Sequence, residues 1–516
     1  MANDNQPQTE LLNGHQLSLE QIVRISKARH KVALCPDAIE KVRTARLSVE
    51  NRLKSNETFY GINTGFGALA SVRIPAAQLQ QLQINLIRSH ACGVGDPLDS
   101  STVRAVMVLR LQTMLRGNSG VREHILRQME FFLNEGIHPI VPSQGSVGAC
   151  GDLAPLAHLA LALVGEGHCE WKNEIRPTME ILAQLGRQPI VPEAKEGLSL
   201  INGTQVMTAL GLLGLDAAAQ ILCTADISAS MSLDATLGTA TAFRSEIHSV
   251  RPHSGQIASA KNMRRILEND PLMQSHAACS KVQDPYSFRC APQVHGAARN
   301  AYKHVLDTLI TEANSSTDNP LVFAESNEIL SGGNFHGEPV AMVLDYLAIA
   351  IAEIASISER RIDKLVNPHM SGLPAFLVKE SGLNSGFMIP HVVAAALVSE
   401  NKVHCHPASV DTIPTSAEQE DHVSMGMTSA LKLHRVLNNT ARVLAIETIA
   451  AAQGLEFHAP QLPGAGVHAA AEFVRRHSAK LDVDRSIAAE IEIISRNILN
   501  GEMRRHVESY VGELDL

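Results

Sequence analysis

Residues 145–158 read GSVGACGDLAPLAH, a glycine-rich turn that runs directly into an apolar segment. Asp152 is a good N-cap residue and Pro155 falls in a first helical turn, so a helix is predicted over Leu153–Leu163. Ala149-Cys150-Gly151 then lies at the positive end of the helix dipole, with almost no side-chain bulk around its backbone. Small residues let a backbone nitrogen approach a carbonyl two residues back, so this tripeptide can close on itself. The alternative is an ordinary turn before a core helix.

Helical patterns extend on both sides of this stretch. Periodic apolar positions predict helices from about Leu19 and at 37–55, 77–92, 101–116, 122–135, 204–235, 293–317, 338–366, 386–402 and 422–452. Ser18 is expected to cap the first of them and Asn202 the long one that follows Thr204. Strand-like and loop material is concentrated at 168–192. The expected fold is therefore mainly α.

This pattern predicts a long-helix bundle with a smaller mixed N-terminal region. The expected regions are 1–205, which carries a glycine-rich loop at Tyr60 and the turn at Cys150, then a central bundle at 206–480, then a helical tail at 481–516. Val340–Val366 lacks glycine and proline, which corresponds to ~40 Å of helix. Several apolar helices of this length cannot all be covered within one small monomer, so a homo-oligomer is expected.

Composition narrows the class of protein. The chain has 516 residues, of which 45% are hydrophobic and only 3% aromatic, which favours tight helix-on-helix packing over a β-sandwich. The net charge is −9 and no basic stripe appears, which argues against nucleic acid and against an anionic membrane as partners. Eight scattered cysteines without a CxxC pair, a polar N-terminus and the lack of an apolar span of ~18 residues predict a cytoplasmic protein without a membrane helix.

A second polar cluster lies between predicted helices at Gln283–Cys290. Tyr286 and Arg289 are three residues apart, so on a turn or helix start they point the same way. Arginine binds a carboxylate through two parallel hydrogen bonds, and a tyrosine beside a cation can act as a base. The alternative is a surface arginine with a core tyrosine. His404 and His406 have a spacing that does not suit one helix face, so no metal site is expected.

Five motifs in order then resemble the aromatic amino acid ammonia-lyase family. They read YGINTGFG at 60–67, NGTQ at 202–205, QDPYS at 283–287, DNP at 318–320 and GNFH at 333–336. The resemblance runs from about Leu19 to beyond Gln453. It implies the fumarase/ammonia-lyase-like helical fold and a homotetramer whose active sites draw residues from three subunits.

The resemblance also implies a cofactor made from the chain itself. In the family, an Ala-Ser-Gly tripeptide condenses into 4-methylidene-imidazol-5-one (MIO), and the matching residues here are Ala149, Cys150 and Gly151. Cys150 stands where the family has serine. The middle residue must lose its β-substituent, and thiolate is not a poorer leaving group than hydroxide, so the ring is expected to form with loss of hydrogen sulfide.

Within the family, Ser89-His90 and Gln419-Glu420 are most similar to the histidine ammonia-lyases. A histidine and a glutamate can hydrogen-bond both nitrogens of an imidazole. The implied reaction converts L-histidine to trans-urocanate and ammonia. The implied roles are Tyr286 as base, Tyr60 on the amine or as acid, Arg289 on the carboxylate, His90 and Glu420 on the imidazole, Asn202 and Gln283 on cofactor and substrate, and Phe335 and Met388 around the ring.

Two alternatives remain open. One is a lyase or 2,3-aminomutase for another aromatic amino acid on the same scaffold. The other is a non-catalytic relative that binds an amino acid as a sensor, which requires Cys150 to stay uncyclised. The Pro390-His391 pair departs from the Ala-Gln associated with histidine lyases and alters the surroundings of the pocket.

Overall fold

The computed structural model describes residues 8–54, 59, 61–65, 67–69, 71–149, 151–276 and 282–516. Tyr60 and Cys150 lie outside the described residues. The chain forms two compact units. Unit 1 comprises 1–213, 306–344 and 407–431, and unit 2 comprises 214–305, 345–406 and 432–516. The three consecutive regions expected from the sequence stay a prediction.

Unit 1 combines helices with short strands. Its helices are α1 (Leu19–Ser26), α2 (Pro36–Leu53), α3 (Leu79–His90), α4 (Ser100–Leu115), α5 (Glu123–Glu135), α6 (Leu153–Leu163), α7 (Thr178–Gln184) and α8 (Glu196–Ile201). Its strands are β1 (Thr9–Leu12), β2 (Lys31–Leu34), β3 (Val94–Pro97), β4 (His138–Pro139), β5 (Pro142–Gln144), β6 (His168–Trp171), β7 (Glu174–Pro177), β8 (Leu321–Phe323) and β9 (Glu328–Leu330). Within the stretch 168–192, expected to hold strand and loop material, the strands β6 and β7 end at Pro177 and the helix α7 follows from Thr178.

The strands of unit 1 form small, separate sheets. β1 pairs with β2 in parallel, while β3–β5, β8–β9 and the three-stranded β4–β6–β7 sheet are antiparallel. Helices dominate the rest of the described chain, so the mainly α prediction is confirmed.

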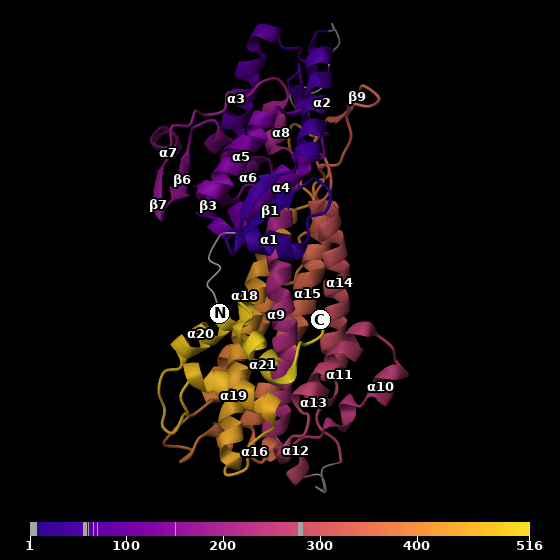
Figure 1. Ribbon diagram of the computed structural model, residues 1–516. Helices are drawn as coiled ribbons and strands as arrows, with labels where there is room; N and C mark the ends of the chain where they lie inside the picture. The colour runs from indigo at the N-terminus through magenta and orange to yellow at the C-terminus, as the bar shows by residue number, and fades with distance from the viewer. Residues whose placement is uncertain are drawn as a thin grey trace. The chain divides into compact units, whose positions relative to one another are not determined.

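Four long helices contribute residues to both units (Figure 1). They are α9 (Gln205–Ala235), α14 (Ala291–Ala313), α15 (Glu338–Val366) and α18 (Gly426–Leu455). Unit 2 adds α10 (Ser245–Ser249), α11 (Ser254–Ile266), α12 (Pro271–Ser275), α13 (Tyr286–Arg289), α16 (Pro368–Ser371), α17 (Met388–His404), α19 (Ala465–His477), α20 (Ala488–Leu499) and α21 (Glu502–Val511).

Buried ionic groups join the long helices within unit 2. Glu447 of α18 accepts hydrogen bonds from Ser232 of α9 at 2.7 Å and from Arg361 of α15 at 2.9 Å. Asp226 of α9 accepts a hydrogen bond from the Nδ1 atom of His295 in α14 at 2.8 Å. All five side chains are fully buried. Buried charges are costly unless paired, so these contacts fix which helix faces meet.

Two helices are long and apolar enough to cross a membrane by length and composition alone. In α9 and α15, 83% and 61% of the most apolar 18-residue window is buried inside the protein, among the described residues. Burial of this kind is typical of core helices in a globular protein.

Candidate functional site

A cavity of about 980 Å³ lies within unit 1 and collects residues from distant parts of the sequence. Five of the expected site residues line it: His90, Ala149, Asn202, Phe335 and Glu420. They come from the end of α3, the turn before α6, the end of α8, the segment before α15 and the segment before α18. The fold thus brings together one half of the site expected from the sequence.

The turn before α6 is closed by backbone pairing. Gly148 and Gly151 form an antiparallel bridge, and Gly151 also pairs in parallel with Gly203. Gly148 and Gly151 have φ values of +76° and +69°, a conformation that favours glycine. A Cβ atom at Gly151 would collide with the Gly203 carbonyl. Gly151 is therefore held close to Gly148, the residue before the tripeptide, and to Gly203 through a contact that only glycine permits.

Ala149 itself is buried against the segment that precedes α18. It packs with Val423 and Met425 in a small apolar cluster. The N–H of Met425 donates to the Val147 carbonyl at 2.8 Å, and the Ser424 hydroxyl donates to the Gly148 carbonyl at 3.3 Å. The segment before α18 thus holds the first residues of the turn in place.

Asp152 occupies the N-cap position of α6, but its side chain caps a different helix. Its Oδ2 atom accepts hydrogen bonds from the N–H groups of Val206 at 2.9 Å and Met207 at 2.8 Å, at the start of α9. Its Oδ1 atom accepts one from the Ser146 hydroxyl at 3.1 Å, and no side-chain bond caps α6. Burial raises the pKa of Asp152 to about 7, against the effect of these hydrogen bonds. The carboxyl group thus ties the turn to the start of α9.

Asn202 does not cap the long helix, so that expectation from the sequence is wrong. It ends α8, and its Nδ2 atom donates to the Asn319 carbonyl at 3.1 Å. Its Oδ1 atom is buried and has no hydrogen-bond partner among the described residues. Asp152 supplies the α9 cap in its place.

His90 presents a defined tautomer. Its Nδ1 atom lies 2.8 Å from the Leu86 carbonyl oxygen, which can only accept, so Nδ1 carries the hydrogen. Burial lowers the pKa of His90, opposed by the Leu86 carbonyl and by the Glu420 carboxylate. A neutral His90 therefore keeps Nε2 as a free lone pair that can accept a hydrogen bond.

Glu420 is held by a hairpin rather than by a helix start. Thr415 and Glu420 exchange backbone hydrogen bonds of 2.9 and 3.2 Å, and the Thr415 hydroxyl donates to the Glu420 carboxylate at 2.7 Å. The helix α18 begins only at Gly426, four residues later than the sequence pattern predicts. Glu420 and Asp421 therefore line the cavity and lie before the helix.

Four expected site residues belong to unit 2 and do not line this cavity: Gln283, Tyr286, Arg289 and Met388. Tyr286 and Arg289 open and close α13, and the Arg289 guanidinium lies 4.5 Å from the centroid of the Tyr286 ring. The expectation that these two side chains point the same way is confirmed. Tyr286 is 71% exposed in the single chain, so its ring is available to another molecule.

A group of possible metal ligands also borders the cavity. His336, Glu338 and His422 offer ligand atoms within 4.8 Å of one another. However, Nε2 of His336 lies 3.0 Å from the His422 carbonyl, and Nδ1 accepts from the Glu338 N–H at 3.3 Å. Both ring nitrogens of His336 are already engaged by backbone, which disfavours metal binding. The expectation of no metal stays a prediction.

Two buried cations beside the cavity were not expected from the sequence. Lys195 and Arg110 are fully buried, and Lys195 contacts Asp318, which the sequence marks only as part of a motif. Burial lowers the pKa of Arg110 to about 10, with Asp318 acting in the opposite direction. A lone lysine in a mixed stretch resembles a surface residue, so no local pattern could reveal its burial.

Comparison with known proteins identifies the family to which this chain belongs. A family model described as aromatic amino acid lyase matches residues 17–476. A histidine ammonia-lyase from Myxococcus xanthus is 50% identical over 499 residues, which cover 97% of this chain and 98% of that protein. The chain therefore belongs to the aromatic amino acid lyase family.

Solved structures of other proteins have a similar fold over nearly the full length of this chain. Histidine ammonia-lyase from Trypanosoma cruzi has a TM-score of 0.90 and 42% identity, covering 98% of this chain and 96% of that one. Tyrosine aminomutase from Streptomyces globisporus has a TM-score of 0.93 and 36% identity, covering 99% and 100%. The family thus includes both lyases and aminomutases on one scaffold.

Proposed function

We propose that this chain is a histidine ammonia-lyase that converts L-histidine to trans-urocanate and ammonia. The observation that carries the proposal is the meeting of His90, Glu420 and Ala149 in one cavity. His90 offers an acceptor nitrogen and Glu420 a carboxylate, which match the two N–H donors of a protonated imidazole ring. The relatives from Myxococcus xanthus and Trypanosoma cruzi carry this activity in their names and match nearly the full chain.

The residues of the turn fit the formation of MIO. Family members use this cofactor, and the bridge that brings Gly148 and Gly151 together is compatible with ring closure in the tripeptide. Closure joins the Gly151 nitrogen to the Ala149 carbonyl carbon and releases the carbonyl oxygen as water. Cys150 then loses its α-hydrogen and its sulfur as hydrogen sulfide, which leaves an exocyclic methylidene group. The ring would supply an electrophilic carbon for the substrate's amino group.

The residues of the cavity bind and orient the substrate. His90 and Glu420 take the imidazole through its two nitrogens, and Phe335 forms a wall of the pocket. A phenyl ring would leave both polar side chains without partners in a buried site, so the pocket selects imidazole. Tyr60 belongs to the glycine-rich loop and acts on the amine or as the acid.

The remaining roles fall to unit 2 of a neighbouring subunit. Arg289 binds the substrate carboxylate, Tyr286 removes the β-proton, and Gln283 and Met388 complete the pocket. The high exposure of Tyr286 in the single chain supports this assignment, because a base must be shielded from water when it acts. We infer a homotetramer with shared active sites in the cytoplasm, without a nucleic acid or membrane partner.

Two measurements test the proposed function. Purified protein incubated with L-histidine should produce urocanate, followed by its ultraviolet absorbance, at a far higher rate than product from phenylalanine or tyrosine. The intact mass should lie ~52 Da below the sequence mass, from the loss of one water and one hydrogen sulfide. Turnover of tyrosine to a β-amino acid would favour an aminomutase instead. A full mass together with amino acid binding would favour a sensor.

A further inference from the structure

Lys195 is a fully buried lysine at the start of α8. Its side chain is 0% exposed, and its backbone has a φ of +73°, in the left-handed region. Its ammonium group donates to the Ser199 hydroxyl at 2.8 Å and to Asp318 Oδ2 at 3.1 Å. Burying a lysine costs free energy unless its charged group is paired, so a lysine at this position is expected to have a structural or functional role.

A chain of hydrogen bonds leads from Lys195 to the cavity. The Oδ1 atom of Asp318 accepts from the N–H of Asn319 at 2.7 Å. The Asn319 carbonyl accepts from Asn202 Nδ2 at 3.1 Å, and the Asn319 side-chain oxygen accepts from the Gly332 N–H at 2.8 Å. Asn202, Asn319 and Gly332 all line the cavity. Movement of Asp318 would therefore be transmitted directly to the cavity wall.

This chain determines which way the Asn202 amide faces. A carbonyl oxygen can only accept a hydrogen bond, so the group beside the Asn319 carbonyl must be the NH₂ group of Asn202. The Oδ1 atom is left as the buried acceptor without a partner among the described residues. Buried acceptors in proteins are normally paired with an N–H or O–H donor, and a bound ligand can supply one at this atom. The substrate offers two such groups, an imidazole N–H and an ammonium.

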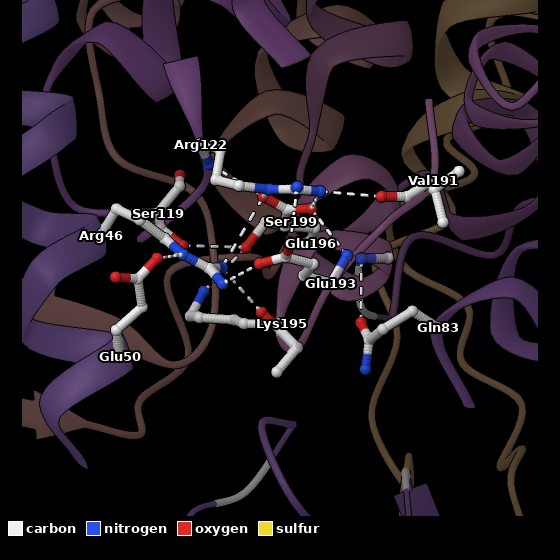
Figure 2. Close-up of polar contacts among 12 residues, drawn as sticks. Arg46, Glu50, Gln83, Ser119, Arg122, Val191, Glu193, Lys195, Glu196 and Ser199 are labelled. Atoms are coloured by element: carbon white, nitrogen blue, oxygen red, sulfur yellow. Dashed lines mark hydrogen bonds and ion pairs between the residues drawn. The ribbon is translucent and has the colours of Figure 1, made fainter. Parts of the chain in front are cut away.

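The outer side of the same segment is held by separate ion pairs. Arg122 binds Glu196 through Nε at 2.8 Å and through Nη2 at 2.7 Å, and it binds Glu193 at 2.7 Å. Figure 2 shows Arg46 beside the same two glutamates, with Lys195 and Ser199 next to them. Glu193 is 45% exposed, so its contacts can be altered without reaching the cavity. This outer cluster supplies a control for any general loss of packing.

We propose that Lys195 is a positioning residue that, through Asp318 and Asn319, orients Asn202 so that its Oδ1 atom accepts a hydrogen bond from the substrate's ammonium group. The proposal rests on the proposed function, in which His90 and Glu420 already take the imidazole nitrogens. The ammonium is then the remaining donor for Oδ1. Lys195 itself touches no reacting atom.

The first experiment compares two non-reacting inhibitors in the full-length enzyme. D-Histidine carries the ammonium group, whereas 3-(imidazol-4-yl)propanoate lacks it. The variant Lys195→Met should weaken inhibition by D-histidine by ~10-fold or more and leave inhibition by the propanoate within ~2-fold, because only the ammonium contact is lost. Equal weakening of both inhibitors would overturn the proposal, since general damage to the pocket does not discriminate between them.

A double-mutant cycle with Asn202→Ala tests the route. In the unmodified background, Lys195→Met should lower kcat/KM for histidine by ~10-fold or more. In the Asn202→Ala background, the same change should lower kcat/KM by no more than ~3-fold. Additive losses would show that Lys195 does not act through Asn202. Intact mass should show the same ~52 Da loss in every variant, which separates orientation from ring formation.

The matched control is Glu193→Gln, which removes the ion pairs of Glu193 with Arg46 and Arg122 and should leave both inhibition constants unchanged within ~2-fold. Failure of this inference is distinguishable from failure of the proposed function. If the unmodified enzyme makes no urocanate, the proposed function has failed. If it makes urocanate but Lys195→Met affects both inhibitors alike, only the role of Lys195 has failed.

Discussion

At the scale of single residues, His90 should decide the substrate. The variant His90→Phe removes the Nε2 acceptor and leaves an imidazole N–H without a partner in a buried pocket. We expect kcat/KM for histidine to fall by ~10²-fold and turnover of phenylalanine to rise in comparison. Parallel assays for urocanate and cinnamate measure both changes.

Ser89→Ala is the matched control for that variant. The Ser89 hydroxyl lies 3.0 Å from His90 Nδ1, but the Leu86 carbonyl already holds the same nitrogen at 2.8 Å. Loss of the Ser89 hydroxyl should therefore change kcat/KM for histidine by less than ~3-fold. A large effect of Ser89→Ala, or histidine turnover unchanged in His90→Phe, would contradict the role given to His90.

A second residue-scale prediction concerns Asp234, a fully buried carboxyl group in α9. Neither of its oxygens accepts a hydrogen bond from a donor group of the described residues, and its carboxyl group faces that of Asp270. Burial, and then the nearby Asp270, raise its pKa from 3.8 to about 8. Because the folded-state pKa is raised, the stability linked to this group is fully present below about pH 4 and is lost as pH rises through about 8.

Asp234→Asn should remove this loss, because an amide N–H can replace the carboxylic proton beside Asp270. We expect the variant to gain several kcal/mol over the unmodified protein at pH 9 and little or nothing at pH 4, because the carboxyl group of the unfolded chain ionises above about pH 4. Thermal unfolding at both pH values measures the difference. The control is Asp482→Asn, which removes a carboxylate that is 65% exposed and should show no such pH dependence. A gain that is equal at both pH values would disprove the assignment.

At the scale of elements, the start of α9 depends on a glycine outside the expected ring. Gly203 has a φ of +140°, pairs with Gly151, and accepts a hydrogen bond from the Asp152 N–H at 2.7 Å. A Cβ at Gly203 would approach the Gln205 side chain to 2.5 Å and Arg110 to 2.8 Å. Gly203→Ala should therefore open the turn and prevent ring closure, so the intact mass should stay at the sequence value.

The control variant Gly186→Ala introduces backbone strain without a steric collision of the new Cβ atom. Gly186 also has a positive φ, +64°, but a Cβ there meets nothing within 4 Å. This variant should keep the ~52 Da mass loss and more than half of the activity, since it pays only the backbone cost. Ring formation in Gly203→Ala would refute the importance of the Gly151–Gly203 pairing.

Helix positions were predictable where the signal is local. Ser18 and Gln21 form the capping box at α1, and α6 and α15 span the residues expected from their apolar periodicity. Asp152 shows the limit of such signals. An aspartate is expected to accept hydrogen bonds from the N–H groups at the start of a helix. The helix that Asp152 caps begins more than fifty residues further along the chain, so only the tertiary fold determines which helix start it contacts.

The same limit applies to the site. The resemblance predicts which residues matter, and the cavity brings five of them together. Lys195 escapes prediction because its partner Asp318 is 123 residues away in the sequence. A buried charge is visible only when the packing around it is known.

At the scale of the whole molecule, the expected site residues divide between the two units. His90, Asn202 and Glu420 belong to unit 1, while Tyr286 and Arg289 belong to unit 2. The proposed tetramer resolves this division if each site takes the unit 1 residues from one subunit and the unit 2 residues from neighbouring subunits. Such sharing has a consequence that can be measured by mixing variants.

Glu420→Gln and Tyr286→Phe should each lose activity by ~10²-fold or more when expressed alone. Co-expressed in equal amounts, they should regain about a quarter of the unmodified activity, because one site in four receives both intact halves in a random assembly. A mixture of Glu420→Gln with His90→Phe should regain nothing, since both changes fall in the same half. If the first mixture also stays inactive while mixed tetramers are present by mass, each site is built from one chain, and the proposed sharing is wrong.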